Sequence, residues 1–287
     1  MDAPETVRAL VARIATELAA GGRAESEWEA REIVTALREA PRSWAATAGD
    51  TVVDATFRAR AMQATAALLR GMPIQYAVGT AAFRSLVLAV DPRVLIPRPE
   101  TELLVDLVLR LAPAHGVAAD IGTGSGCIAL ALATEGAFSQ VIATDLSGDA
   151  LRVAEGNLHR IPADRRARVR FRQGADLTPV AGERLTALVS NPPYIAHAEA
   201  DGLPPLVRDW EPPTALFSDA DGMGHITRLA AGSAACVVPG GLLALEVDSR
   251  RADEAATIIA RDARWGTVTI HQDLTGRDRF VTALRQE

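Results

Sequence analysis

The stretch "VAADIGTGSG", residues 117–126, decides the fold. A short apolar run leads into a loop with glycine at Gly122, Gly124 and Gly126, and the apolar residues "CIALALA" follow. This order predicts a buried strand, a tight turn and a helix, because glycine allows the backbone conformations that such a turn requires. Ligands bind at the carboxyl ends of the strands in sheets built from such units, so we expect a ligand site at this loop.

Strand and helix patterns alternate from this loop to the end of the chain. The apolar runs that we expect to be strands are residues 117–122, 140–147, 167–176, 185–189, 240–247, 267–274 and 278–285. Helical patterns lie between most of them, which predicts a mostly parallel sheet with helices on both faces. Only "TGR" joins the last two runs, and because this is too short for a parallel crossover, the last strand should be antiparallel. The predicted fold class is α/β, with a seven-stranded Rossmann-like sheet.

The residues before this region predict a separate helical domain. Apolar spacings of three and four indicate three helices in a small bundle, over residues 5–20, 25–39 and 50–70. β-prone runs on both sides of Gly79 predict a hairpin turn there, and Pro99 opens an amphipathic helix. The expected domains are a helical domain for substrate recognition, a hairpin linker and an α/β domain, residues 1–72, 73–98 and 99–287.

The composition excludes several classes of protein. All 30 basic residues are arginine, which excludes a P-loop of the GK[ST] type, a Schiff-base lysine and a pyridoxal enzyme. The net charge of −6 argues against a surface that coats nucleic acid. Cys127 and Cys236 lack the spacing of a disulfide framework or a zinc site, and we expect no metal. The chain has neither a run of about 18 apolar residues nor a secretory signal, which indicates a cytoplasmic protein.

Three acidic residues lie near the ends of successive strands beside the glycine loop. Asp120 precedes the loop, Asp145 suits the two hydroxyls of a ribose, and Asp176 suits an adenine amino group. A dinucleotide fingerprint would need glycine at 127, where the chain has Cys127, so a dehydrogenase is disfavoured. An acidic residue before a GxGxG loop suits a cationic ligand, and together these features predict an S-adenosylmethionine site. The predicted cofactor residues are Asp120, Gly122, Thr123, Gly124, Ser125, Gly126, Asp145, Asp176, Leu177 and Asn191.

The segment "NPPY" directly follows the fourth strand of this region. Two prolines fix φ and remove two backbone donors, so the nearby carbonyl groups remain as acceptors. Asn191 adds a side-chain carbonyl and Tyr194 a flat ring, which suits a planar substrate with an NH₂ group. Accepting both N–H hydrogens, on Asn191 and on the Pro192 carbonyl, would orient the nitrogen for methyl transfer, and positioning can supply about 7–11 kcal/mol. The predicted catalytic residues are Asn191, Pro192 and Tyr194, and Pro193 joins them in binding the substrate.

The motifs "DIGTGSG", "TDLS" and "NPPYI" resemble those of class I S-adenosylmethionine methyltransferases that modify planar NH₂ groups. Within this class, "VLIPRPETELLVD", "EPPTALFSDADGM" and "GGLLALE" are similar to the release factor glutamine methyltransferases, the HemK/PrmC family. The resemblance implies that the substrate is the glutamine side-chain amide in the GGQ motif of peptide chain release factors. It also implies that residues 122–126, Asp145 and Asn191 contact the cofactor and that residues 191–194 contact the glutamine. We expect a monomer without membrane or nucleic-acid partners.

Some positions depart from the family pattern or carry no assigned role. Leu177 stands where some relatives place an aromatic residue against the adenine, and "LEVDSRR" keeps Glu246 but differs over residues 248–251. Glu100 and Glu102 suit the first turn of a helix. Two roles are equally open for Phe83 and Arg98. Each residue either packs or forms a structural ion pair, or it contacts the cofactor or the substrate.

Three other functions fit parts of the sequence. A DNA adenine methyltransferase uses the same NPPY chemistry on a flipped base, but it needs a basic cleft and a large recognition segment. A ribosomal-protein glutamine methyltransferase would carry a different sequence in place of "IPRPETE". A silent S-adenosylmethionine-binding or RNA-chaperoning module is disfavoured by the intact residues 191–194. We therefore favour methyl transfer to a release-factor glutamine.

Overall fold

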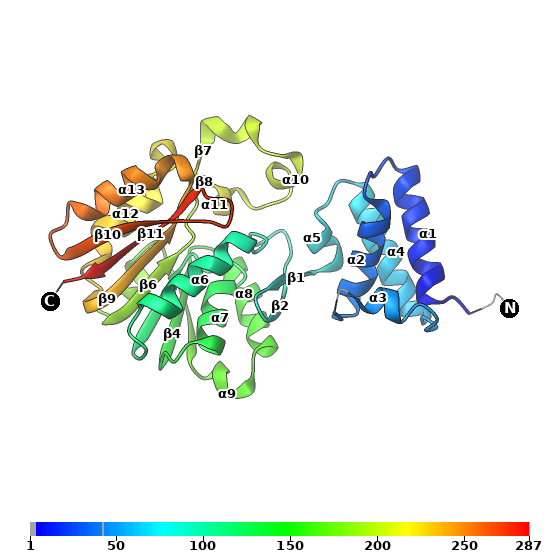
Figure 1. Ribbon diagram of the computed structural model, residues 1–287, viewed down its shortest axis with the longest axis horizontal. Coiled ribbons are helices and arrows are strands. Elements are labelled where there is room, and N and C mark those ends of the chain that lie inside the picture. Colours follow the sequence, from blue (N-terminus) through cyan, green and yellow to red (C-terminus); the bar gives the residue numbers. More distant parts are fainter. Residues whose placement is uncertain (1–3, 42, 287) are drawn as a thin grey trace. The chain divides into compact units, whose positions relative to one another are not determined.

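The computed structural model describes residues 4–41 and 43–286, and it divides into two compact units, Met1–Ala81 and Ala82–Glu287 (Figure 1). The helices of the first unit are α1 (Val7–Ala20), α2 (Ser26–Leu37), α3 (Trp44–Thr47), α4 (Ala55–Leu69) and α5 (Ile74–Val78). Their apolar faces meet in one buried cluster, which includes Leu10, Ile14, Ile33 and Leu68. The third helix was expected over residues 50–70 but begins at Ala55 as α4. The Asp54 side chain caps it there by accepting a hydrogen bond from Phe57 N.

A hairpin of β1 (Thr80–Phe83) and β2 (Leu86–Ala89) follows the first unit's helices. The prediction that it turns at Gly79 is wrong. Gly79 instead ends α5 in a left-handed conformation with φ of +79°, which glycine adopts without strain. The run before Gly79 is thus helical, and the hairpin turns at Arg84 and Ser85.

The second unit contains the predicted seven-stranded sheet, with strand order β10-β11-β9-β6-β3-β4-β5 (Figure 1). Its strands are β3 (Val117–Ile121), β4 (Gln140–Asp145), β5 (Val169–Gln173), β6 (Leu185–Ser190), β9 (Val237–Glu246), β10 (Trp265–Gln272) and β11 (Asp278–Arg285). Strands β5, β4, β3, β6 and β9 run parallel to one another, whereas β11 is antiparallel to both β9 and β10. The predicted fold class and the antiparallel last strand are confirmed.

Helices cover both faces of this sheet. The main ones are α6 (Pro99–Leu111), α7 (Cys127–Glu135), α8 (Gly148–Asn157), α12 (Gly224–Ser233) and α13 (Ala252–Ala260). Side chains of α6 and α7 pack on one face and those of α12 and α13 on the other, because successive strand residues point to opposite faces. In β3, for example, Ala118 joins the first apolar cluster and Ala119 the second. Helix α12 ends at Ser233, and the last of the parallel strands, β9, begins at Val237.

Short elements connect these strands and helices. Between β6 and α12 lie β7 (Ile195–Ala196), η3 (His197–Gly202), α10 (Pro205–Arg208), α11 (Pro213–Leu216), β8 (Phe217–Ser218) and η4 (Ala220–Gly222). The others are η1 (Leu158–Arg160), α9 (Ala163–Arg166), η2 (Thr178–Val180) and η5 (Ser249–Arg251). Among the residues that the structure describes, none of the helices is sufficiently long and apolar to cross a membrane.

Candidate active site

The register of the parallel strands brings four motif residues to one edge of the sheet. One row of paired residues crosses β4, β3, β6 and β9 at Thr144, Ile121, Ser190 and Leu245. The residues that directly follow this row are Asp145, Gly122, Asn191 and Glu246. Parallel strands end at the same edge, so four motifs that are far apart in sequence emerge side by side at the carboxyl ends of the strands.

A cavity of about 390 Å³ lies at this edge. Its wall includes Gly122 and Gly124 from the glycine loop, Asp145 from β4, and Asn191 and Pro192 after β6. Its volume falls in the range of small-molecule sites, which are about 300–1,000 Å³. Gly122, Gly124 and Asn191 also border a smaller neighbouring cavity, where they are joined by Thr123 and Ser125. The structure thus brings the glycine loop and the NPPY segment to the same space.

Asp120 stabilises the glycine loop through hydrogen bonds. This carboxylate is fully buried, and its Oδ2 accepts hydrogen bonds from Thr123 Oγ1 at 2.6 Å and from Ala129 N at 3.1 Å. Burial raises the pKa of Asp120 to about 7. Gly122 and Gly124 have φ of +75° and +54°, and no atom lies within 4 Å of a Cβ placed on either. The backbone is therefore free for close approach of a ligand.

Asp145 lines the cavity beside this loop. Its Oδ2 accepts a hydrogen bond from Gly124 N at 2.9 Å, and its Oδ1 accepts one from Ser147 N at 2.8 Å. Burial raises the pKa of Asp145 above its ordinary value. Each carboxylate oxygen keeps a second lone pair, so Asp145 can still accept hydrogen bonds from ligand hydroxyl groups.

Asp176 also lines the cavity, but it lies three residues beyond the end of β5 and has a positive φ of +46°. Its Oδ1 is 2.7 Å from Nδ1 of His225, and its Oδ2 accepts a hydrogen bond from Nε of Arg228 at 2.6 Å. His225 belongs to the cavity wall as well. Leu177 instead packs against the apolar cluster under α12, so contact with an adenine ring stays a prediction for this residue.

Asn191 is held by a chain of side-chain hydrogen bonds. Its Nδ2 donates to Thr101 Oγ1 at 3.1 Å, and the Thr101 hydroxyl donates to Glu246 Oε2 at 2.7 Å. Thr101 and Glu246 are 2% and 1% exposed, and burial raises the pKa of Glu246 to about 7. Before Asn191, the Ser190 hydroxyl donates to Ile121 O at 2.6 Å and ties β6 to β3.

The two prolines and the tyrosine of NPPY have different surroundings. Pro192 and Pro193 line the cavity, whereas Tyr194 is outside its wall and packs against the apolar cluster of α12 and α13. Burial raises the pKa of the Tyr194 phenol. The substrate-contacting role predicted for Tyr194 therefore stays a prediction.

After Tyr194 the chain forms a second, very short parallel sheet of β7 and β8. The ring of Phe217 in β8 lines the cavity, and His197 stacks on it with ring centroids 5.2 Å apart. The segment between these strands also contributes Pro212, Thr214 and Ala215 to the wall. A segment that leaves a buried strand through two prolines thus folds over the ligand space.

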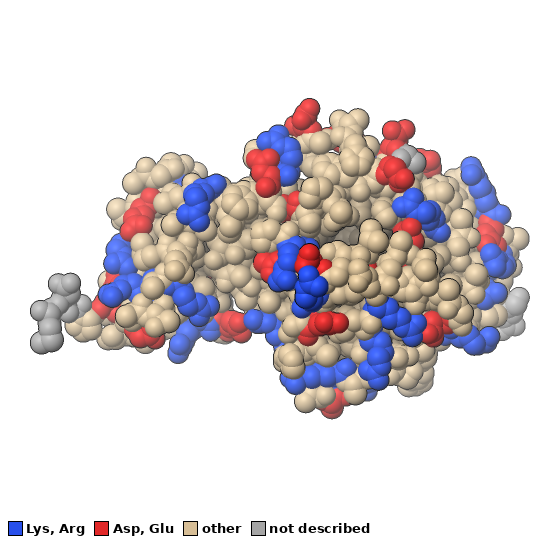
Figure 2. Space-filling model, turned by 180° about the vertical axis from the view of Figure 1, so that it is seen from behind, with Lys and Arg blue, Asp and Glu red and all other residues tan. Residues whose placement is uncertain are grey.

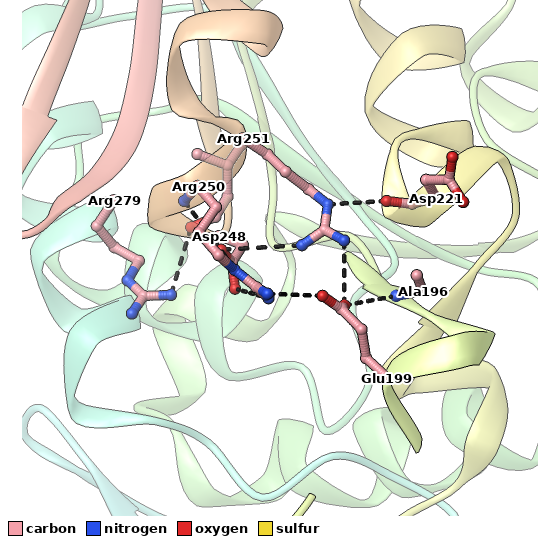
Figure 3. Close-up of polar contacts among 8 residues, drawn as sticks. Ala196, Glu199, Asp221, Asp248, Arg250, Arg251 and Arg279 are labelled. Carbon is pink, nitrogen blue, oxygen red and sulfur yellow. Dashed lines mark hydrogen bonds and ion pairs between the residues drawn. The ribbon is translucent and has the colours of Figure 1, made fainter. Parts of the chain in front are cut away.

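Arg251 fastens this segment to the end of β9 (Figure 3). Its Nε donates to Asp221 O at 2.9 Å, and its Nη2 donates to Glu199 Oε2 at 3.0 Å. The same Glu199 oxygen accepts a hydrogen bond from Ala196 N at 3.0 Å. Arg250 adds an ion pair to Glu199. The residues that depart from the family pattern thus hold the chain that follows NPPY.

The open assignments of three further residues can be compared with the structure. Phe83 is fully buried in the core cluster of α6 and α7. Arg98 pairs with the carboxylate of Glu211, which is 3% exposed and whose pKa burial raises. Glu100 lies exposed in the first turn of α6. Phe83 is thus packed in the core, Arg98 forms an ion pair and Glu100 lies at a helix terminus, whereas contact of Phe83 or Arg98 with cofactor or substrate stays a prediction.

Sequence reasoning missed several residues of the cavity wall. Those to which the sequence assigned no role include Arg93, Leu95, Leu146, Thr214, Phe217 and His225. Most lie on connections whose path depends on tertiary packing, so periodicity gives no signal for them. Leu146 follows Asp145 directly in a strand-end loop, and Leu95, Thr214 and Phe217 lie within quoted family motifs, so these positions carried a usable signal.

Comparison with known proteins agrees with this geometry. The family model described as "Methyltransferase small domain" matches residues 99–203. The release factor glutamine methyltransferase of Moorella thermoacetica is 43% identical over 219 residues, which are 76% of this chain and 76% of the relative. That of Xylella fastidiosa is 38% identical over 255 residues, which are 88% of this chain and 91% of the relative. The methyltransferase domain implies S-adenosylmethionine as the methyl donor.

Solved structures share the fold at low sequence identity. A methyltransferase from Pyrococcus furiosus has a TM-score of 0.53 and 17% identity and covers 82% of this chain and 100% of its own. The hMettl16 catalytic domain has a TM-score of 0.56 and 16% identity, and the match covers 81% of this chain and 82% of that domain. These structures support the fold, and the identities of the curated relatives decide the family. This chain belongs to the release factor glutamine methyltransferases.

Proposed function

We propose that this protein transfers a methyl group from S-adenosylmethionine to the side-chain amide nitrogen of the glutamine in the GGQ motif of peptide chain release factors. One observation carries the proposal: Asn191 and Pro192 line the same cavity as Gly122, Gly124 and Asp145. Acceptors for a planar amide and a nucleoside site therefore border one space. The names of the curated relatives support the choice of substrate.

The residues present fit the cofactor. Asp145 offers free lone pairs for the ribose hydroxyls, and Gly122 and Gly124 leave open space for close approach. The second oxygen of Asp120 is buried without a hydrogen-bond partner in the described residues, but the walls of the two cavities at the glycine loop do not include Asp120, so its contact with the cofactor stays a prediction. Asp176 and His225 would stand at the adenine. S-adenosylmethionine supplies an electrophilic methyl group, which the amide nitrogen accepts as it loses one proton.

The chain's own contribution is orientation of a weak nucleophile. An amide nitrogen shares its lone pair with the carbonyl group, so it attacks only when it is held in line. The side-chain oxygen of Asn191 and the carbonyl oxygen of Pro192 would each accept one N–H hydrogen, which fixes the nitrogen and favours the positive charge that develops on it. Positioning of this kind can lower the barrier by about 7–11 kcal/mol. A strong general base before the attack is not required.

The other target classes have less support. On the face drawn in Figure 2, basic and acidic side chains are interspersed rather than gathered into a basic field, and the net charge is −6. Binding along a nucleic-acid backbone depends on such a field, which disfavours duplex DNA as the substrate. The proposal includes a monomer that acts in the cytosol, where release factors meet the ribosome.

The decisive assay combines the purified protein, radiolabelled S-adenosylmethionine and a recombinant release factor. A matched release factor with the GGQ glutamine replaced by asparagine is the control. We expect label only in the first sample, and equal labelling of both would refute the proposal. Label in duplex DNA but not in the release factor would favour the adenine methyltransferase.

A further inference from the structure

We infer that Thr101 and Glu246 are positioning residues that hold the side-chain amide of Asn191 with its nitrogen turned toward Thr101 and its oxygen free to accept a hydrogen bond from the substrate. The inference rests on the proposed function for the identity of the substrate. Thr101 and Glu246 would thereby fix which atom of the Asn191 amide faces the substrate.

The position of hydrogens along this chain follows from counting donors. A threonine hydroxyl has one hydrogen, and at 2.7 Å from Glu246 Oε2 it donates that hydrogen to the carboxylate. Thr101 Oγ1 can then only accept from Asn191 at 3.1 Å. Asn191 must therefore present its NH₂ group to Thr101, since its carbonyl oxygen cannot donate.

The position of Glu246 beside Asn191 supports this direction. Glu246 directly follows the residue of β9 that pairs with Ser190, so the register places it beside Asn191. Burial has the largest effect on Glu246 and raises its pKa to about 7, whereas the hydrogen bond from Thr101 and the charges of Arg279 and Arg98 oppose this rise. At a pH above this value the ionised carboxylate is an acceptor only, so it fixes the Thr101 hydroxyl as the donor and makes their hydrogen bond charge-assisted. Thr101 is 2% exposed, which keeps water from competing for the contact.

A fixed amide of this kind selects the substrate. With its nitrogen occupied, Asn191 presents an oxygen toward the cavity and requires an N–H donor opposite. A glutamine side chain supplies this donor, whereas an ionised glutamate side chain of the same shape supplies only acceptors. The chain of hydrogen bonds would thus let the enzyme distinguish glutamine from glutamate, because an acceptor that a bound side chain shields from water without offering a donor is costly.

Asparagine occurs only twice in the sequence, at Asn157 and Asn191, which allows a direct test. In protein labelled with ¹⁵N-asparagine, NMR should show two side-chain NH₂ pairs. Asn157 is fully buried, and its Nδ2 donates to Ala89 O and Ser125 O at 2.9 Å each, so its pair is an internal reference. We expect Thr101→Val and Glu246→Gln to shift the Asn191 pair and leave the Asn157 pair in place. An unchanged Asn191 pair in Thr101→Val would overturn the inference.

Activity provides the second measurement, with Thr101→Ser and Thr134→Val as controls. Thr101→Val should lower kcat about 10- to 100-fold with little change in cofactor affinity, as for a misplaced reacting group. Thr101→Ser keeps the hydroxyl and should remain within about threefold of wild type. Thr134→Val removes a hydroxyl that donates to Leu130 O near the end of α7 and should change neither value. A release-factor peptide with GGE should compete better against the glutamine peptide in Thr101→Val than in wild type.

Equal kcat for wild type and Thr101→Val, or equal losses in Thr101→Val and Thr101→Ser, would also overturn the inference. If the wild-type protein methylates no release factor, the proposed function fails, whereas the NMR signals of Asn191 still decide the orientation of its amide. The two failures are therefore distinguishable.

Discussion

A methyl group added to the glycine loop should block the cofactor without a matching loss of stability. Gly122 and Gly182 form a matched pair, because their φ angles are +75° and +81° and no atom lies within 4 Å of an added Cβ at either position. Gly122 lines the cavity, whereas Gly182 lies exposed after η2. The variants Gly122→Ala and Gly182→Ala therefore share the backbone strain and differ in what the methyl group faces.

The expected magnitudes follow from this comparison. An L-residue in the left-handed region costs about 1–2 kcal/mol, so both variants should lose this amount of stability. For a protein of this size, each kcal/mol lowers Tm by about 2–4 °C. In Gly122→Ala the methyl group also stands in the cavity, and we expect cofactor binding to weaken at least about tenfold, or about 1.4 kcal/mol. Gly182→Ala should bind the cofactor as wild type does.

Two measurements test this prediction. Isothermal titration calorimetry with S-adenosylhomocysteine gives the affinity, and thermal unfolding gives the change in Tm. The reasoning is refuted if Gly122→Ala binds as tightly as wild type, or if Gly182→Ala loses as much affinity as Gly122→Ala. A much larger loss of Tm in Gly122→Ala would show that its methyl group meets protein rather than the cavity.

Three more predictions concern the segment over the cavity and the buried acids. Arg251→Gln removes the Arg251 contacts drawn in Figure 3 and should raise KM for the release factor several-fold in steady-state kinetics, more than Arg250→Gln, whose side chain is 64% exposed. Glu211→Ala leaves Arg98 unpaired and should lower the free energy of unfolding by about 3 kcal/mol in urea, the lower end for a broken buried pair because Arg98 is 31% exposed. Burial raises the pKa of Glu246 from 4.5 to about 7, so the folded state keeps a proton that the unfolded state has lost, and stability should fall as the pH rises through this window. Urea unfolding at pH 5 and pH 8 should differ less in Glu246→Gln than in wild type.

The sequence predicted the parts of the site that depend on local order along the chain. The strand before Gly122 and the helix after Gly126 follow from periodicity and glycine, and the structure has them as β3 and α7. Asp145 ends β4 as predicted, and Asn191 directly follows β6. In each case the residue lies within one position of a buried strand, so the strand pattern fixes its place in space.

Features that depend on partners distant in sequence could not be predicted. The carboxylate of Asp176 is shared between His225 and Arg228, which are about 50 residues away. The hairpin turn was placed at Gly79 because glycine after an apolar run suits both a hairpin and the end of a helix, and only the packing of α5 decides between them. Arg251 likewise gave no signal, since its partners lie on loops without a repeating pattern.

The geometry of the sheet explains why "SNPPYIAHA" follows a buried strand. Strand β6 lies next to β3 at the point where the chain order of the sheet reverses, so the residue after Ser190 emerges beside Gly122. A regular turn into a helix at this point would direct the unpaired N–H donors of its first turn to the cavity. The two prolines remove two such groups, and the short pairing of β7 with β8 then carries the chain across the cavity. The Asn191 amide, held by Thr101, is thereby left at the cavity wall as an acceptor, which a helical continuation would not provide.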